Sequence, residues 1–442
     1  MAALSARRIR PYPCAVNDSK SSQETDTAPR ISLRSLALLL GGLAMFGPFS
    51  IDTIFPAFEH MGAELGADKV AMQQTISVYL LAYALMSVVH GPLSDAIGRR
   101  KVILGGLIVF TFASVGCALS RDLTTLLAFR ALQGLSAGVG LIVGRALIRD
   151  VLQGHDAQRL MSQVSMIFGV APAIAPIIGG WILGWGHWSA IFWFLVGFSL
   201  LLLLAVWIAL PETHPPQARL SLAPKRLLRD YWAIFVNPRF QRLAAAGTFN
   251  FGALFLYISS APAFVLDLLR LNERQFAWFF VPMIGGMMLG AYTSGRTAGK
   301  ISGTRLANIG FLFCGLGALA NVLYNGLVPV PSIPWAVLPM MIGSFGIALV
   351  FPILTLAVLD MYPRQRGSAS SLQAFTSLVM NAIVAGVLSP LLSGSGLYLA
   401  LGAAVFTLLG WLFWRWEMST GQGAAPECAP EAVAALEPTD RL

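Results

Sequence analysis

Long apolar segments alternate with short polar ones from about residue 35 to residue 416. A helix of about 20 apolar residues crosses the ~30 Å hydrocarbon core of a bilayer. The pattern therefore predicts twelve membrane-spanning helices, near residues 35–57, 72–93, 101–119, 124–147, 160–183, 189–210, 241–263, 276–296, 305–326, 333–359, 368–392 and 396–416. We accordingly expect an all-α integral membrane protein.

A longer polar stretch, 211–240, divides these helices into two groups of six. We expect an N-terminal bundle over residues 35–210, a linker over 211–240 and a C-terminal bundle over 241–416. The flanking segments 1–34 and 417–442 are polar or rich in Ala, Glu and Pro, so we expect disordered tails there. Segment 1–34 also has no apolar core of the kind that a cleavable signal peptide requires.

Basic residues concentrate in every second loop, whereas the alternate loops are acidic, mixed or uncharged. Short loops rich in Lys and Arg stay in the cytoplasm. We therefore expect both termini and the linker to be cytoplasmic, which an even number of spans requires. The basic loop residues are Arg99, Arg100, Lys101, Arg149, Arg159, Arg219, Lys225, Arg226, Arg229, Arg239, Arg242, Arg296, Lys300, Arg305, Arg364 and Arg366.

Composition supports a membrane protein. Of 442 residues, 56% are hydrophobic and 12% charged, where a soluble chain carries roughly 25% charged residues. The mean hydropathy is +0.70. A net charge of +9 could indicate nucleic-acid binding, but the basic residues lie in short clusters between the apolar segments, so we expect no nucleic-acid partner. The four cysteines have no spacing typical of a metal site or a disulfide framework, and we expect no metal.

The two groups of six show signs of an internal repeat. The fourth and tenth predicted helices leave the membrane through Asp150 and Asp360, each followed by a basic residue and a new span rich in small residues. Repeated halves are typical of transporters, whose substrate site lies between the halves near the middle of the membrane. Chance similarity of two cytoplasmic turns is the alternative.

Residues 90–106, between the second and third spans, read HGPLSDAIGRRKVILGG. Gly91 would let a neighbouring helix approach, Asp95 lies at a helix end and Gly98 turns the chain. The segment resembles the G-x-L-x-D-x-x-G-R-R/K motif of the major facilitator superfamily. Ala96 stands where many members have an arginine, and an ordinary positively charged loop is the alternative interpretation.

The same end of the bundle carries residues that we expect to form a charge cluster between the second, third and fourth helices. We expect this cluster to close the inner gate, whereas solvated loop charges are the alternative. The expected gate residues are Gly91, Asp95, Gly98, Arg99, Arg100, Arg149 and Asp150.

The fourth span, FRALQGLSAGVGLIVGRALIRD (129–150), resembles the R-x-x-Q-G motif of the superfamily. An arginine inside a span is costly and usually functional, although a long side chain near the interface can also reach water. Gly134, Gly138, Gly140 and Gly144 suit close helix packing.

The fifth span, GVAPAIAPIIGGWI (169–182), resembles the antiporter motif of drug:proton antiporters. Prolines bend a helix and free backbone carbonyls, and glycines leave room for a partner helix. The resemblance implies export rather than import, while a bend without a coupling role is the alternative. The residues of the expected kink are Gly169, Pro172, Pro176, Gly179 and Gly180.

The two prolines of APAIAP, together with SIDTIFPAF (50–58) and GRALIRD (144–150), are similar to the bicyclomycin/chloramphenicol-resistance (Bcr/CflA) branch of the drug:proton antiporters. The resemblance covers nearly the whole chain except its tails. It implies a monomeric transporter with the major facilitator fold in the inner membrane of a bacterium, acting without a cofactor on protons and small molecules.

Asp52 is the only carboxylate well inside a predicted span, about five residues or ~8 Å from its outer end. Arg130 lies at a similar depth, about six residues or ~9 Å from the outer end of the fourth span. In the fold that the resemblance implies, these helices are neighbours, so we expect an ion pair that couples transport to protons. A static ion pair, or a helix cap by Asp52, is the alternative.

A multidrug cavity is expected to be apolar, adaptable and lightly polar. Helical spacing places Met45 and Phe49 on the face of Asp52, and Asn250 and Tyr257 on one face of the seventh span. The candidate cavity residues are Met45, Phe49, Gln133, Asn250, Tyr257 and Phe351. For any single aromatic or Met residue, lipid contact or helix packing is the alternative role.

The function that these features favour is proton-coupled export of amphenicol-, bicyclomycin- or sulfonamide-like compounds, as the branch resemblance implies. A metabolite exporter of the same fold, for an amino acid or a sugar, is the main alternative. A membrane enzyme is disfavoured because no His, Asp and Glu cluster suits metal binding. The repeat and the proline-containing fifth span disfavour a channel or a receptor.

Overall fold

The computed structural model describes residues 33–152, 154–214, 219, 224–297, 300–362 and 365–420, with the side chains of some residues in the charged helix ends left undescribed. Residues 1–32 and 421–442, which make up most of the expected tails, lie outside the described residues. The described part of the chain contains helices and no strand.

The N-terminal half consists of six long helical segments and one short helix. Helix α2 contacts α3, and the fourth segment is α5 and α6 joined by a π-helical turn, Val139–Val143. The helices are α1 (Leu33–Asp52), α2 (Phe58–Leu65), α3 (Lys69–Ile97), α4 (Arg99–Ala118), α5 (Leu123–Gly138), α6 (Gly144–Val151), α7 (Gly154–Leu183) and α8 (Ser189–Ala209).

The C-terminal half repeats the pattern of six long segments. Its fifth segment is α14 and α15, joined by the π-helical turn Val384–Leu388. The helices are α10 (Pro238–Ser259), α11 (Ala277–Thr297), α12 (Gly303–Leu327), α13 (Leu338–Met361), α14 (Arg366–Ile383), α15 (Ser389–Leu392) and α16 (Gly396–Ser419). The linker between the halves contains an additional helix, α9 (Pro224–Phe235).

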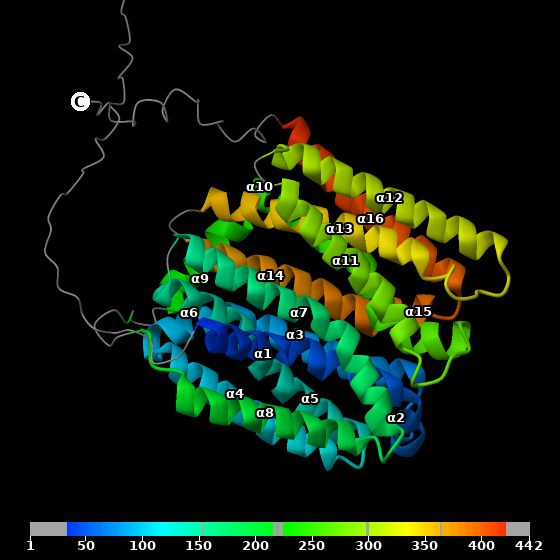
Figure 1. Cartoon of the computed structure of the whole chain (residues 1–442), viewed down its shortest axis with the longest axis horizontal. Helices are drawn as coiled ribbons and strands as arrows, with labels where there is room; N and C mark the ends of the chain where they lie inside the picture. Colours follow the sequence, from blue (N-terminus) through cyan, green and yellow to red (C-terminus); the bar gives the residue numbers. More distant parts are fainter. Residues whose placement is uncertain are drawn as a thin grey trace, which may run out of the picture.

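The long helices run roughly side by side, with the N-terminal half below the C-terminal half in the view of Figure 1. Two helix pairs join the halves, α3 with α14 and α7 with α11. We name the two ends of the bundle by what lies there. The linker end holds the junction of α3 and α4 at Gly98, and the α2 end holds helix α2.

Local sequence signals explain where several helices begin. The side chain of Asp68 accepts a hydrogen bond from the backbone of Ala71 (2.7 Å) at the start of α3, and Asp122 accepts one from Thr125 (2.8 Å) at the start of α5. These are N-caps. The hydrogen bonds from Thr125 hold the pKa of the exposed Asp122 carboxyl below its ordinary value.

Within the described residues, nine helical segments are long and apolar enough to cross a membrane. The remaining long helices are α7, whose apolar part is Ile167–Leu183, α10 and α11. Arginines near the start of α10 and small or polar residues in α11 lower their hydropathy. Together these segments give the expected twelve spans in two bundles of six.

Two helix ends differ from the sequence prediction. Helix α1 ends at Asp52 rather than at residue 57, because the chain turns there into a short 3-10 helix, Phe55–Ala57, that contains Pro56. At the other terminus, α16 continues to Ser419 and includes Glu417, which the prediction assigned to a disordered tail.

Candidate functional site

Asp52, the last residue of α1, is 3% exposed. After this end of α1 the chain turns into the 3-10 helix Phe55–Ala57 and then into helix α2, whose first residue, Phe58, is buried. A helix carries a partial negative charge at its C-terminus, which disfavours a carboxylate there, so the interpretation of Asp52 as a helix cap does not hold. No ion pair or side-chain hydrogen bond found in the described part of the chain involves Asp52.

Arg130 of α5 is completely buried and connects three helices. Its Nη1 donates to the carbonyl oxygen and to the hydroxyl of Ser50 on α1, each at 3.0 Å. Its Nε donates to the carbonyl oxygen of Thr75 on α3 at 3.1 Å, and its guanidinium lies over the ring of Tyr79. Arg130 therefore connects α1, α3 and α5. Its partner on α1, Ser50, lies two residues before Asp52 in the chain.

The expected ion pair between Asp52 and Arg130 is absent from this conformation, so that prediction is wrong for the state described. The guanidinium is held by Ser50, Thr75 and a third partner, Gln133, instead. Its Nη2 nitrogen nevertheless has no hydrogen-bond partner among the described residues. The site thus contains a buried acid and a buried donor atom that are both without a polar partner.

Gln133, predicted to line the substrate cavity, is buried beside Arg130. Its Oε1 accepts from Arg130 Nη1 at 2.7 Å, and its Nε2 donates to the hydroxyl of Ser114 on α4 at 2.8 Å. In this conformation Gln133 therefore orients the arginine.

The predicted kink residues of α7 fall into two groups. The helix continues through Pro172 and Pro176 without a break, and a methyl group on Gly169 would meet no other atom within 4 Å. By contrast, a methyl group on Gly179 would lie 2.0 Å from the carbonyl oxygen of Thr53, and one on Gly180 would lie 2.3 Å from that of Glu273. Only glycine at positions 179 and 180 permits these backbone contacts. The contact of Gly179 is with Thr53, the residue that follows Asp52.

At the linker end, three of the predicted gate residues come together. Arg99 pairs with Asp95 on α3, and its Nε donates to Asp150 Oδ2 on α6 at 2.9 Å. Gly98 has a φ of +107°, a conformation that other residues rarely adopt, and its position lets the backbone N–H of Arg99 donate to Glu212 Oε1 at 2.9 Å. The expected connection between the second, third and fourth spans is present.

Other predicted gate residues lie outside this cluster. Arg100 turns to α8, where its Nη2 donates to the carbonyl oxygen of Trp207 at 2.7 Å and its guanidinium lies over the Trp207 ring. A methyl group on Gly91 would meet only Ser371 Oγ, at 3.9 Å, so Gly91 makes no close helix approach here, contrary to expectation. The side chain of Arg149 lies outside the described residues.

A set of contacts at the α2 end, which the sequence analysis did not single out, joins the two halves. Gln73 donates to the carbonyl oxygen of Ser259 (2.9 Å), and Ser77 donates to that of Ala382 (2.9 Å). Closer to solvent, Lys69 pairs with Asp267 at 2.5 Å, and the rings of Phe55 and Phe280 stack. Gln74 and the exposed His60 make further contacts, to Gly386 and Glu273. The halves are therefore closed against each other at this end.

The predicted cavity residues occupy different environments. Phe49 is buried and its ring stacks with those of Phe194 and Phe198 on α8, while Met45 is partly buried against the same core. Phe351 on α13 is 44% exposed, with Phe251 of α10 beside it. Only Phe351 of these three presents a large open surface.

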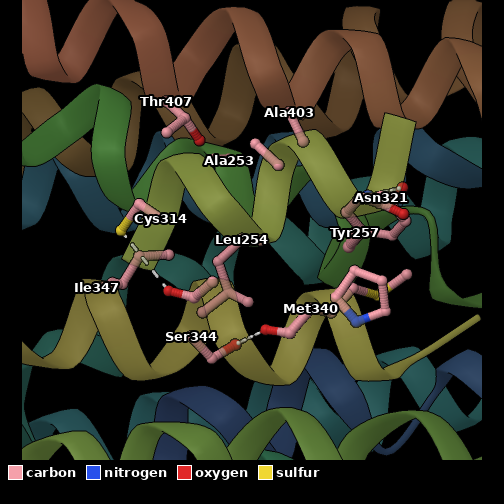
Figure 2. A pocket seen from close by; sticks show the side chains of 14 residues that line it. Ala253, Leu254, Tyr257, Cys314, Asn321, Met340, Ser344, Ile347, Ala403 and Thr407 are labelled. Carbon is pink, nitrogen blue, oxygen red and sulfur yellow. Dashed lines mark hydrogen bonds between the residues drawn. The ribbon is translucent and has the colours of Figure 1, made fainter. Parts of the chain in front are cut away.

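Asn250 and Tyr257 point into the interior of the C-terminal half. Tyr257 Oη accepts a hydrogen bond from Asn321 Nδ2 of α12 at 2.7 Å, at one end of a cavity of about 40 Å³ between α10, α12, α13 and α16 (Figure 2). The cavity has room for a water molecule but not for a drug. Asn250 is 1% exposed and its backbone packs against Gly410 of α16.

Residues 38–385 match the model of the family described as the Major Facilitator Superfamily. The chain belongs to this superfamily. Its helical architecture agrees with two solved structures of low sequence identity. One is the D-xylose-proton symporter (TM-score 0.67, 14% identity, 86% of this chain and 98% of that one). The other is the human organic anion transporter MFSD10 (TM-score 0.65, 17% identity, 88% and 100%).

Relatives of known name point to one branch of the superfamily. The chain is 31% identical to the uncharacterized MFS-type transporter YdgK of Bacillus subtilis, over 79% of this chain and 87% of that one. It is 26% identical to the bicyclomycin resistance protein homolog of Haemophilus influenzae (80% and 88%) and 28% identical to multidrug resistance protein D of Escherichia coli (82% and 90%). The resemblance to the bicyclomycin/chloramphenicol-resistance branch is confirmed. These relatives are transporters and not enzymes, and this superfamily member is a multi-pass membrane protein.

Proposed function

We propose that this major facilitator protein exports small drug-like compounds, of the amphenicol, bicyclomycin or sulfonamide type, in exchange for protons. The names of its relatives support the substrate class, since they refer to bicyclomycin and multidrug resistance. We further propose that it acts in the inner membrane of a bacterium, with the linker end and both termini in the cytoplasm. The clustering of basic residues in the linker-end loops supports this orientation.

The observation that carries the proposal is the buried, unpaired carboxyl group of Asp52, two residues after Ser50, which binds the partly unpaired guanidinium of Arg130. An isolated buried carboxylate costs several kcal/mol when it is ionised, so such a group holds a proton until a counter-ion or water reaches it. Arg130 Nη2 is the candidate counter-ion in this mechanism, because Arg130 is already bonded to Ser50, two residues before Asp52 in the chain. Asp52 is the proton carrier in this mechanism.

The closed contacts at the α2 end give the proposed cycle its starting point. With that end outside the cell, the conformation described is one in which protonated Asp52 is screened from the outside. Substrate arriving from the linker side shifts α1 against α5, Asp52 meets Arg130 and its proton leaves inward. The α2 end then opens, substrate leaves outward and Asp52 takes up a new proton.

The proton gradient supplies enough energy for such exchange. One proton that moves down about 100 mV releases about 2.3 kcal/mol, and a gradient of about one pH unit adds about 1.4 kcal/mol. The sum sustains a concentration ratio of several hundredfold for a neutral substrate at one proton per molecule.

Substrate-triggered proton release in everted membrane vesicles tests this function. We expect chloramphenicol to trigger release in vesicles that contain the wild-type protein and to trigger none with Asp52→Asn, which cannot carry the proton. Asp122→Asn is the matched control, because the same chemical change falls on an exposed N-cap that Asn fills equally well. Normal drug extrusion by Asp52→Asn against a pH gradient would show that the proton travels elsewhere.

A further inference from the structure

Helix α9 of the linker has two apolar faces. One is buried: Tyr231 and Ile234 pack into a hydrophobic cluster with Phe240, Ala369 and Leu372 of the C-terminal half. The other is open, with Leu228 72%, Trp232 64% and Phe235 40% exposed. Residues spaced by four and three positions share one side of a helix, so these three form a continuous stripe. In water, exposing such an apolar stripe would be unfavourable, so the stripe indicates an apolar neighbour.

Basic residues flank the open stripe. Lys225 and Arg229 are exposed and precede Leu228 and Trp232 by three positions, which places them at the edge of the same side of the helix. Ala233 and Asp230 lie farther around, toward the side away from the stripe. An apolar stripe with Trp and Phe, bordered by Lys and Arg, is typical of helices that lie in the interface of a bilayer.

The contacts of α9 place it beside the linker-end part of α3, within the length of that helix. The Tyr231 hydroxyl donates to the carbonyl oxygen of Val88 on α3 at 2.9 Å. Val88 precedes Ile97, the end of α3, by nine residues, so the contact lies about 13 Å below the tip of that helix at 1.5 Å per residue. Helix α9 therefore lies at the linker end of the bundle, in contact with α3 and α14 (Figure 1).

Other tryptophans at the linker end mark the same boundary. Trp207 and Trp416 are 65% and 56% exposed and lie in the last turns of α8 and α16. Exposed tryptophans gather at the membrane–water interface, where their rings contact the headgroup region. Trp232 continues this set of residues on α9.

We propose that α9 lies in the bilayer interface at the linker end, with Leu228, Trp232 and Phe235 among the lipid chains and Lys225 and Arg229 on the phosphates of anionic lipids. This surface is separate from the proton site, and the inference does not depend on what the protein transports. Because α9 also contacts Val88 of one half and Ala369 and Leu372 of the other, a lipid-bound α9 is attached to both moving bodies.

A fluorescent probe on α9 tests the proposal in the full-length protein in lipid nanodiscs. Cys14 and Cys428 are replaced by Ser, while Cys117 and Cys314 are buried and stay. Bimane is attached at Trp232→Cys or, as the matched control one position along the helix, at Ala233→Cys. We expect lipids with a nitroxide near the headgroup to quench the probe at 232 more than iodide does, and the order to reverse at 233.

Anionic lipid is the second variable. We expect phosphatidylglycerol to strengthen lipid quenching at 232 relative to phosphatidylcholine alone, and Lys225→Gln with Arg229→Gln to remove that difference. Equal iodide quenching at 232 and 233 would place the stripe in water, and protection of 232 from both quenchers would place it against protein. Either result overturns the proposal, as does quenching that is the same with and without phosphatidylglycerol. None of these readouts requires transport, so the antiport proposal stands or falls separately.

Discussion

Two buried carboxyl groups, one in each half, have opposite surroundings. Glu417 of α16, at the linker end, is 1% exposed and accepts from Arg239 Nε at 2.8 Å and Arg242 Nε at 2.9 Å. Asp52 of α1, at the α2 end, is 3% exposed, and the arginine expected to pair with it, Arg130, bonds to Ser50 and Gln133 instead. Burial alone therefore does not distinguish a structural acid from a functional one, whereas the pairing of each acid does.

The difference follows from the cost of burying charge. A carboxylate that accepts hydrogen bonds from two guanidinium groups ties its own helix to the helix that supplies them, here α16 to α10. A carboxyl group without such donors can change its protonation state when its surroundings change. Glu417 fits a permanent contact within one half, and Asp52 fits a site that changes during a cycle.

Removal of the paired acid is expected to have the largest effect on stability. Glu417→Gln leaves two arginines facing a neutral group. Breaking a buried pair costs about 3–5 kcal/mol, and we expect about 2–4 kcal/mol here because Arg239 is 31% exposed. Thermal unfolding in detergent measures the loss. Asp52→Asn, which removes no ion pair, is expected to unfold at the wild-type temperature or slightly above, and an equal loss in both variants would contradict the comparison.

The backbone contact between Gly179 and Thr53 provides a second test of the site around Asp52. Gly179→Ala forces a methyl group against the carbonyl oxygen of Thr53, and overpacking of this kind costs about 1–3 kcal/mol. We expect lower stability together with weaker proton coupling, because α1 is displaced at the residue after Asp52. The control in the same helix is Gly169→Ala, where the methyl group meets nothing and helix propensity favours alanine. Similar behaviour of the two variants would rule out a special role for the contact.

Inside the C-terminal half, the expected effect is smaller and purely structural. Tyr257→Phe removes the acceptor for Asn321 in the 40 Å³ cavity and should cost about 1 kcal/mol. The KM for drug should stay unchanged, because the residue faces the interior of its own half. A changed KM with unchanged stability would instead show that Tyr257 contacts the substrate, as the sequence analysis predicts.

The exposed pair at the α2 end should matter least for stability. The side chains of Lys69 and Asp267 are 80% and 45% exposed, and exposed pairs contribute about 0–1 kcal/mol. The free energy of unfolding of Lys69→Gln should therefore lie within about 0.5 kcal/mol of the wild-type value. This change is much smaller than the one expected for Glu417→Gln. A change as large as that of Glu417→Gln would show that exposure is a poor guide to the strength of ion pairs in this protein.

Helix count, division into halves and superfamily were predictable because apolar runs of span length and the motif around Asp95 and Arg99 are properties of contiguous residues. Asp52 and Arg130 could be singled out because a charged residue stands out within apolar segments, and their role in proton coupling stays a prediction. The cluster of Asp95, Arg99 and Asp150 formed as predicted, and its role as a gate stays a prediction.

Other features depend on how distant segments meet, which spacing along the chain does not encode. Ser50 and Gln133 rather than Asp52 hold Arg130, and a serine and a glutamine in apolar spans gave no signal of that role. Phe49 faces α8, since helical periodicity groups residues on a face but does not say which neighbour the face meets. The polar contacts of Gln73 and Ser77 to backbone carbonyls of the other half have no sequence signature at all.

Gly179 and Gly180 are adjacent, yet one meets Thr53 in its own half and the other meets Glu273 across the boundary between halves. Both contacts bring main chain against main chain, and neither leaves room for a side chain at the glycine. Helix α7 thus touches the residue after Asp52 with one glycine and the C-terminal half with the next, so a movement of that half along α7 reaches the backbone beside the acid directly.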